Sequence, residues 1–175
     1  MRGIQTKDVA RATLLTALAV ALSPLSVPVG ATKVFPAQHM VNVISAVLLG
    51  PWYAILVAFS TSLIRNLLGT GTINAFAGSM IGAALAGLVW RATRNIYASA
   101  LGEVIGTGVL GSLVTVYIVA PNVLHKNLAL GVIGLSFLGS TIVGSIVAVV
   151  VLKGLAAAGY LRPQGRGRVA VSPRE

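Results

Sequence analysis

The sequence contains no cysteine and only three acidic residues, Asp8, Glu103 and Glu175. The lack of cysteine excludes disulfides, thiol catalysis and cysteine-ligated metals. Only 9% of the residues are charged, against roughly 25% in a typical soluble domain, so the charges cannot cover a water-facing surface. This composition excludes a soluble globular domain. It also excludes a disordered chain, because disordered chains are polar and charged.

Motifs for nucleotide binding and hydrolysis are also missing. The sequence has no G-x-x-x-x-G-K-[ST] loop, so it cannot bind ATP by that route. It has no H-E-x-x-H motif and no pair of carboxylates, which leaves a hydrolase or metalloprotease little to work with. We therefore expect a protein that is not an enzyme and that uses no cofactor and no metal ion.

Apolar residues make up 56% of the 175 residues, and the mean hydropathy is +0.91. A membrane-spanning helix needs about 20 apolar residues. The long uncharged stretches are 12–32, 34–64, 66–90, 104–125 and 127–152. The first of them follows basic residues, as in a signal peptide, but it is longer than a signal core. We read it as a retained helix and expect a multi-pass protein of the cell membrane.

The stretch 34–64 contains Gly50-Pro51 in its middle, so it is either two helices or one kinked helix. The positive-inside rule separates these readings. Six spans with both termini cytoplasmic place ten basic residues inside and three outside, whereas five spans place five inside and eight outside. The predicted fold is an all-α bundle of six transmembrane helices at 9–27, 37–49, 52–68, 78–92, 96–119 and 128–153. The net charge of +10 then reflects topology, and we expect no nucleic-acid partner.

Two polar, irregular segments, 26–36 and 65–78, fall on the predicted outer side. The helix 37–49 is too short to cross the bilayer alone, and non-helical backbone at membrane depth is tolerated only where it is buried or lines a cavity. The sequence therefore predicts a cavity that opens outward. We divide the chain into a substrate-binding domain, 1–155, and a basic cytoplasmic tail, 156–175.

The candidate ligand-binding residues are polar groups near this outer side, together with a polar face on the fifth helix. Their hydroxyls, amides and imidazole suit a small, flat, mostly neutral ligand, with Phe35, Phe76 and Met80 as an apolar wall. The set is Gln38, His39, Asn42, Arg65, Asn66, Thr70, Thr72, Ser79, Met80, Glu103 and Thr107. Glu103 has three open roles: an ion pair, for which Arg65 is conceivable, a ligand contact, or a coupling proton.

Small residues four apart lie on one helix face and let helices approach closely. They occur at Ala17 and Ala21, at Gly78, Gly82 and Ala86, and at Gly102 and Gly106. Such a face serves either packing within the bundle or docking of another membrane protein.

Five segments together resemble the ThiW family, the thiazole-specific S components of energy-coupling-factor (ECF) vitamin transporters, over about residues 8–155. They are Lys33-Val34-Phe35-Pro36-Ala37-Gln38-His39, Leu48-Leu49-Gly50-Pro51-Trp52-Tyr53-Ala54, Arg65-Asn66-Leu67-Leu68-Gly69-Thr70-Gly71-Thr72, Gly78-Ser79-Met80-Ile81-Gly82-Ala83 and Gly102-Glu103-Val104-Ile105-Gly106-Thr107-Gly108. Ala77 departs from the family pattern, where proline is expected.

The resemblance implies a six-helix bundle whose outer ligand site is capped by the loop after the first helix. It implies the thiamin precursor hydroxyethylthiazole as substrate, and a transmembrane coupling protein with two ATPase subunits as partners. It also implies that Ala17 and Ala21 form the docking surface for that coupling protein. Two alternatives stay open: an autonomous secondary transporter that uses Glu103, and an S component for another vitamin such as thiamin. A third alternative is a membrane scaffold without a ligand, which predicts that Gln38, His39, Asn42 and Asn66 can be changed without a phenotype.

Overall fold

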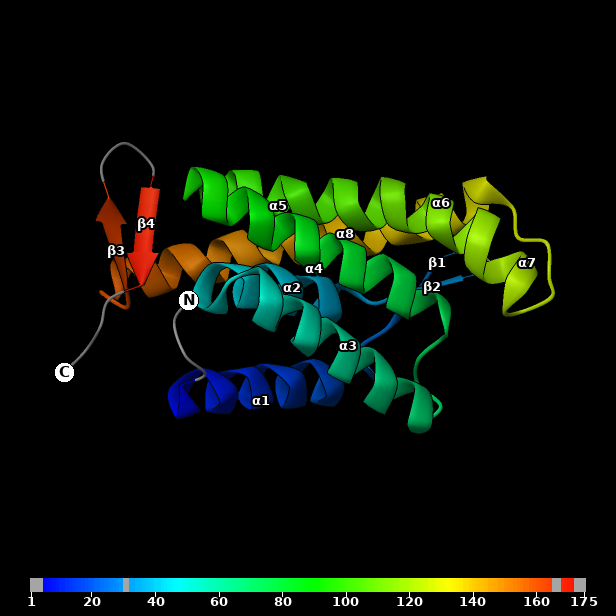
Figure 1. Cartoon of the computed structure of the whole chain (residues 1–175), viewed down its shortest axis with the longest axis horizontal. Coiled ribbons are helices and arrows are strands. Elements are labelled where there is room, and N and C mark those ends of the chain that lie inside the picture. Colours follow the sequence, from blue (N-terminus) through cyan, green and yellow to red (C-terminus); the bar gives the residue numbers. More distant parts are fainter. Residues whose placement is uncertain (1–4, 30–31, 165–167, 172–175) are drawn as a thin grey trace.

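The computed structural model describes residues 5–29, 32–164 and 168–171, and its helices lie along the long axis of the molecule (Figure 1). The described residues form six helical segments, which confirms the all-α class. They are α1 (Thr6–Ala21), α2 (Pro36–Leu49), α3 (Pro51–Leu67), α4 (Asn74–Thr93), the continuous run Ile96–Asn122 and α8 (Leu130–Ala157). Short antiparallel pairs join β1 (Val27–Val29) to β2 (Thr32–Val34) and β3 (Leu161–Gln164) to β4 (Arg168–Val171).

The break at Gly50-Pro51 is confirmed. α2 ends at Leu49 and α3 starts at Pro51, while Gly50 between them has φ +86°. Only glycine adopts this backbone conformation without strain, and proline is well suited to the first turn of the next helix. The stretch 34–64 is therefore two helices joined by a single residue.

Several predicted helix ends are wrong. The first helix ends at Ala21 rather than at residue 27, because Ser23 and Pro24 form a turn and β1 follows. The fourth helix starts at Asn74 rather than at residue 78, so the irregular outer segment is shorter than expected. The last helix continues to Ala157 rather than ending at residue 153.

The fifth helical segment contains two π-helical stretches. It consists of α5 (Ile96–Ile105), η1 (Gly106–Gly111), α6 (Ser112–Val114), η2 (Thr115–Val119) and α7 (Ala120–Asn122). The wider π turn brings residues five apart towards one face. A Cβ added to Gly106 would lie 2.7 Å from the Cα of Gly82, and one added to Gly111 would lie 2.7 Å from the Cα of Gly78. The glycines therefore pack α4 directly against this helix, as the internal-packing interpretation predicts.

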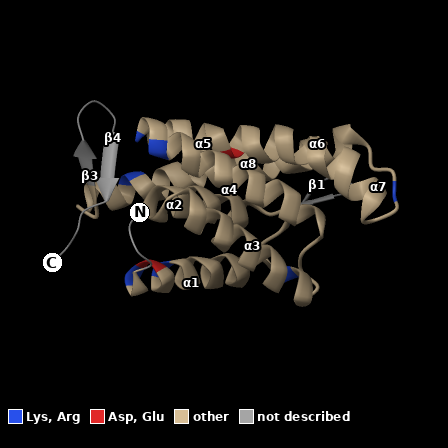
Figure 2. Cartoon of the chain, viewed as in Figure 1, with Lys and Arg blue, Asp and Glu red and all other residues tan. Residues whose placement is uncertain are grey.

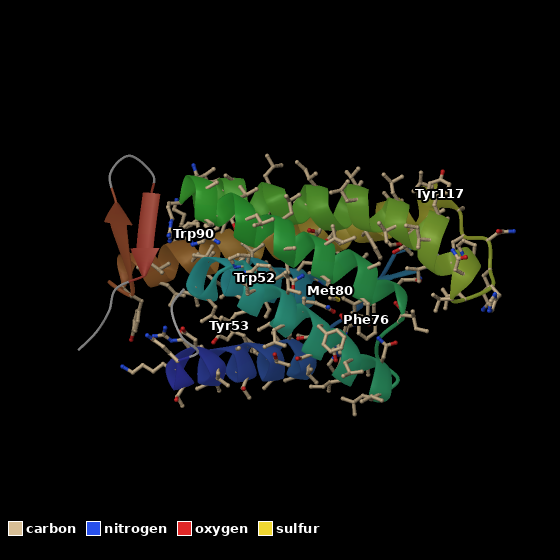
Figure 3. All side chains as sticks on the ribbon, in the orientation of Figure 1. Trp52, Tyr53, Phe76, Met80, Trp90 and Tyr117 are labelled. Carbon is tan, nitrogen blue, oxygen red and sulfur yellow. The ribbon has the colours of Figure 1, made fainter. Side chains whose placement is uncertain are left out.

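Apolar side chains cover the outside of the bundle. Leu135 on α8 is 67% exposed and Val150 is 65% exposed. Basic residues gather at the helix ends, and the long stretch between them shows no Lys or Arg (Figure 2). Tyr117 lies near α7 and Trp90 at the opposite end, near β3 and β4 (Figure 3). This surface matches a bilayer, whose core is apolar and whose interfaces hold charged residues.

Three of the described helices are long and apolar enough to cross a membrane: Asn74–Thr93, Ile96–Asn122 and Leu130–Ala157. α2 is apolar but has only 14 residues, or about 21 Å at 1.5 Å per residue. The predicted short second helix is thus confirmed.

The interior is divided along its length. At the end where α2, α4 and α8 finish, an apolar core contains Val43, Val47, Trp90, Ala148 and Leu152. Leu161, at the start of β3, is fully buried in the same core. Towards the other end the buried residues become polar. One end of the bundle is therefore filled with apolar side chains, and the other has room for a site.

The close contact between Gly82 and Gly106 gives a stability prediction. We expect Gly106→Val to lower the free energy of unfolding by about 1–3 kcal/mol or more, because the new side chain meets backbone that cannot move aside. Gly154→Val on α8 is the matched control, since a Cβ there meets nothing within 4 Å. Thermal unfolding of the purified chain in detergent measures both. Equal melting temperatures for the two variants would contradict the packing argument.

Candidate ligand-binding site

A cavity of about 620 Å³ lies in the polar half of the bundle. Its wall comes from the segment after α1, the start of α2, the end of α3 with its connection to α4, the start of α4, η1 of the fifth helical segment, and the first half of α8. The lining residues used below are Ser23, Phe35, Gln38, His39, Arg65, Thr70, Thr72, Asn74, Ser79, Thr107, Ile133, Ser136, Phe137 and Ser140. This volume suits a small molecule.

Arg65 supplies a buried positive charge to the cavity wall, with only 2% of its surface exposed. Its guanidinium donates to Gln38 Oε1, and its Nη2 donates to the carbonyl of Thr70 at 3.3 Å. The group also stacks over the Phe35 ring, 4.1 Å from the ring centroid. Among the described residues no carboxylate lies within ion-pair distance of it. The predicted possibility of an Arg65–Glu103 pair is therefore not what the structure shows.

A relay of hydrogen bonds continues from Gln38 through the wall. Gln38 Nε2 donates to Ser62 Oγ at 2.8 Å, and Ser62 Oγ lies 3.0 Å from Ser79 Oγ. Ser79 Oγ in turn donates to the carbonyl of Ala75 at 2.7 Å. Because a guanidinium can only donate, the Gln38 amide oxygen faces Arg65 and its nitrogen faces Ser62.

The floor of the cavity rests on Glu103, whose side chain is fully buried. Its Oε1 accepts from His39 Nδ1 at 2.8 Å and from Asn42 Nδ2 at 2.9 Å. The Thr107 hydroxyl lies 3.1 Å from both this oxygen and the Gly78 carbonyl, so its single proton serves one of them at a time. Such convergence of donors stabilises an ionised carboxylate. The basic partner of Glu103 is thus His39.

Glycine makes room for this carboxylate. A Cβ on Gly82 would lie 2.7 Å from Glu103 Oε2 and 2.0 Å from Thr107 Oγ1. On the other side, a Cβ on Gly144 of α8 would lie 2.4 Å from the Pro36 carbonyl and 2.9 Å from His39 Cβ. Close approach of α4 and α8 therefore holds His39 and Glu103 in one geometry.

The outer segments are bound to one another by polar contacts. Asn66 Nδ2 donates to the carbonyls of Ser62 at 2.8 Å and of Thr72 at 3.0 Å, which shapes the turn after α3. Ser23 Oγ and Thr70 Oγ1 lie 3.4 Å apart, and the Phe35 amide donates to Ser140 Oγ at 3.0 Å. The segment after α1 thereby contacts both the α3–α4 turn and α8, as expected for a cap.

The structure brings seven of the eleven predicted site residues to the cavity: Gln38, His39, Arg65, Thr70, Thr72, Ser79 and Thr107. The other four lie behind the wall. Asn42 and Glu103 support His39 from below, and Asn66 supports the turn at Thr72. Met80 packs on an alanine cluster of α2, α3 and α4 instead. Phe76 stacks with Phe59, 5.7 Å between centroids, while Phe35 does line the cavity.

Sequence reasoning missed the contribution of α8. Ile133, Ser136, Phe137 and Ser140 line the cavity from this helix. A signal was present, because Ser136, Ser140 and Gly144 recur every four residues on a helix that is otherwise strongly apolar. Ser23, at the start of the cap, carried no comparable pattern.

Two further predictions concern residues away from the cavity. Ala17 and Ala21 are exposed on α1, with the exposed Leu14 and Leu18 on the same helix.

Within the described part of the chain, no cluster of three or more His, Cys, Asp or Glu could hold a metal ion. The side chain of Lys33 lies outside the described residues.

The arrangement is suited to holding a molecule by directed hydrogen bonds. It offers hydroxyls, one imidazole, one guanidinium and two aromatic rings, Phe35 and Phe137. The one carboxylate is turned away from the cavity and engaged by His39 and Asn42. Groups of these types suit directed hydrogen bonds to a small molecule.

Comparison with known proteins gives two positive findings. A family model described as thiamine-precursor transporter protein (ThiW) matches residues 9–158. A solved structure of the S component of a bacterial ECF transporter superposes with a TM-score of 0.74 at 18% identity, covering 89% of this chain and 98% of that one. No curated protein matches the chain significantly.

At 18% identity the structural likeness shows the fold alone, and it agrees with the membrane-facing surface described above. The family match extends over nearly all of the helical bundle, including every residue of the cavity wall. The chain is a membrane protein that belongs to the ThiW family of thiamine-precursor transporter proteins.

Proposed function

We propose that the chain is the substrate-binding S component of an ECF-type ABC transporter, and that it captures hydroxyethylthiazole outside the cell for ATP-driven uptake by partner subunits. The cavity is the observation that carries this proposal. It is sized for a small molecule, lined by hydroxyls, an imidazole and the guanidinium of Arg65, and backed by an apolar core at the other end of the bundle. Membership of the ThiW family supports a thiamin precursor as the ligand.

Hydroxyethylthiazole matches the groups around the cavity. Its ring is flat and apolar on both faces, which suits Phe35 and Phe137. Its ring nitrogen and hydroxyl each need a directed hydrogen bond, and His39, Arg65 and Ser79 offer them. The molecule is neutral, so it enters the cavity without bringing an unpaired charge out of water.

The orientation in the membrane is part of the proposal. All six helices cross the cell membrane, both termini are cytoplasmic, and the cavity opens outward. The cytoplasmic side then holds ten basic residues and the outer side three, as the positive-inside rule favours. Residues 1–155 form the substrate-binding domain, and 156–175 form a basic cytoplasmic tail.

The energy source lies in other subunits under this proposal, because the sequence has no nucleotide-binding loop. A transmembrane coupling protein with two ATPase subunits is the expected partner. The exposed small residues Ala17 and Ala21 on α1 are the proposed docking face, since small side chains let a partner helix approach closely.

Ligand binding is the primary test. The purified chain in detergent is titrated by calorimetry with hydroxyethylthiazole, thiamin and the pyrimidine precursor of thiamin. We expect saturable binding of hydroxyethylthiazole and weaker or absent binding of the other two. Preference for thiamin would favour an S component for that vitamin, and binding of none of the three would contradict the proposal.

Docking gives a second prediction. Ala17→Trp places a bulky indole on the docking face, so co-purification with the coupling and ATPase subunits falls roughly tenfold or more, while hydroxyethylthiazole binding is retained. Val150→Trp, at an exposed position of α8, is the matched control. An intact complex in Ala17→Trp would contradict the proposed docking face. Uptake that stays intact while no complex with these subunits forms would favour an autonomous secondary transporter.

Topology gives a third prediction, which the lack of native cysteine makes simple to test. Lys126→Cys and Ala92→Cys are both at exposed positions, on opposite sides of the bundle in the proposed topology. In intact cells a membrane-impermeant maleimide should label the first variant and spare the second until the cells are lysed. The reverse pattern would invert the proposed orientation.

A further inference from the structure

His39 has one ring nitrogen committed and one free. Nδ1 is bonded to Glu103 Oε1 at 2.8 Å, so the carboxylate holds the ring in place. Among the described residues no group bonds the other nitrogen, Nε2, and this atom is not among the fully buried unpartnered atoms. His39 lines the cavity and is 7% exposed. The Nε2 edge is therefore the part of the ring that a ligand can reach.

Charge balance favours a positive partner beside Glu103. Glu103 is completely buried, and a buried carboxylate is stable only when a positive group lies beside it. Arg65 is bonded to Gln38 and Thr70 rather than to Glu103. His39 is the group within ion-pair distance. With protons on both nitrogens the ring neutralises Glu103 and presents an Nε2–H donor to the cavity.

Neighbouring hydroxyls cannot replace this donor. Ser79 gives its proton to the Ala75 carbonyl, and Thr107 gives its proton to Gly78 or to Glu103. Gln38 donates to Ser62. These bonds of Ser79, Thr107 and Gln38 all run into the wall, so a proton on His39 Nε2 is a directed donor that no described residue engages.

We infer that His39 selects ligands whose aromatic ring carries a nitrogen with a free in-plane lone pair, and that Glu103 is the positioning residue that holds His39 for this contact. This inference rests on the proposed function and names its specificity. A neutral thiazole has such a lone pair. A thiazolium, in which the nitrogen carries a substituent and a positive charge, has none and would be placed against an imidazolium. The site thus separates the free precursor from the alkylated ring of thiamin.

The test compares two ligands that differ in one atom. Hydroxyethylthiazole and its thiophene analogue, in which C–H replaces the ring nitrogen, are titrated by calorimetry into the full chain in detergent. We expect the thiazole to bind roughly 10- to 100-fold more tightly, the range of a charge-assisted hydrogen bond. Hydroxyethylthiazole methylated on nitrogen should bind no better than the thiophene.

Variants assign the preference to the two residues. His39→Ala should bring the thiazole-to-thiophene affinity ratio close to one, whereas His39→Gln, whose amide N–H lies near the position of Nε2, should restore part of it. Glu103→Gln should also lower the ratio. A purely structural role for Glu103 would weaken both ligands equally and leave the ratio unchanged, which would overturn its assignment as a positioning residue.

The remaining outcomes separate this inference from the proposed function. Equal binding of thiazole and thiophene by the wild-type chain overturns the inference alone. A wild-type preference that persists in His39→Ala does the same, because another group then reads the nitrogen. If neither ligand binds, the proposed function fails, and the inference fails with it.

Discussion

The structure depends on a carboxylate that is buried inside the helical bundle, where an unpaired charge is most costly. Glu103 is fully buried at the middle of the bundle, and an isolated charge there would cost several kcal/mol. Three donors from two helices meet on one of its oxygens. Bare glycine backbone at Gly82 leaves the space that the other oxygen occupies. The glycine stripes, the polar start of α2 and the π turn at Thr107 therefore all serve one requirement, which is to keep this charge buried and bonded.

The same requirement divides the interior into a polar and an apolar half. Below Glu103, Val47, Trp90 and Leu152 fill the space between helices. Above it, hydroxyls and amides bond one another, and these groups pack less completely than aliphatic side chains because their geometry is fixed by their hydrogen bonds. The cavity of about 620 Å³ lies on that side. The bilayer contributes no competing hydrogen bonds along the outer surface, so the polar groups turn inward.

Much of this was predictable from residue patterns, and the remainder needed tertiary contacts. The Gly50-Pro51 break is local chemistry, and the polar start of α2 stood out from its apolar surroundings. Seven predicted residues reach the cavity for that reason. The sequence does not show which polar groups line the cavity and which lie behind its wall. His39 lines the cavity, whereas Asn42 and Glu103 lie further into the bundle. The α8 serines were missed because the apolar residues on all sides of this helix outweigh the four-residue recurrence of Ser136, Ser140 and Gly144.

The two buried charges of the site, Arg65 and Glu103, do not pair, although pairing would neutralise both. Consecutive residues of α2 keep them apart: Gln38 bonds Arg65 and His39 bonds Glu103. A direct salt bridge would fix α3 to α5 across the space that the cavity occupies and would leave no donor for a ligand. Each buried charge is instead bonded to a side chain of α2, Gln38 or His39, that has a further polar atom. Both of these side chains line the cavity, so the groups that satisfy the buried charges also form its polar wall. Specificity for a small molecule then follows from the same contacts that make the buried charges tolerable.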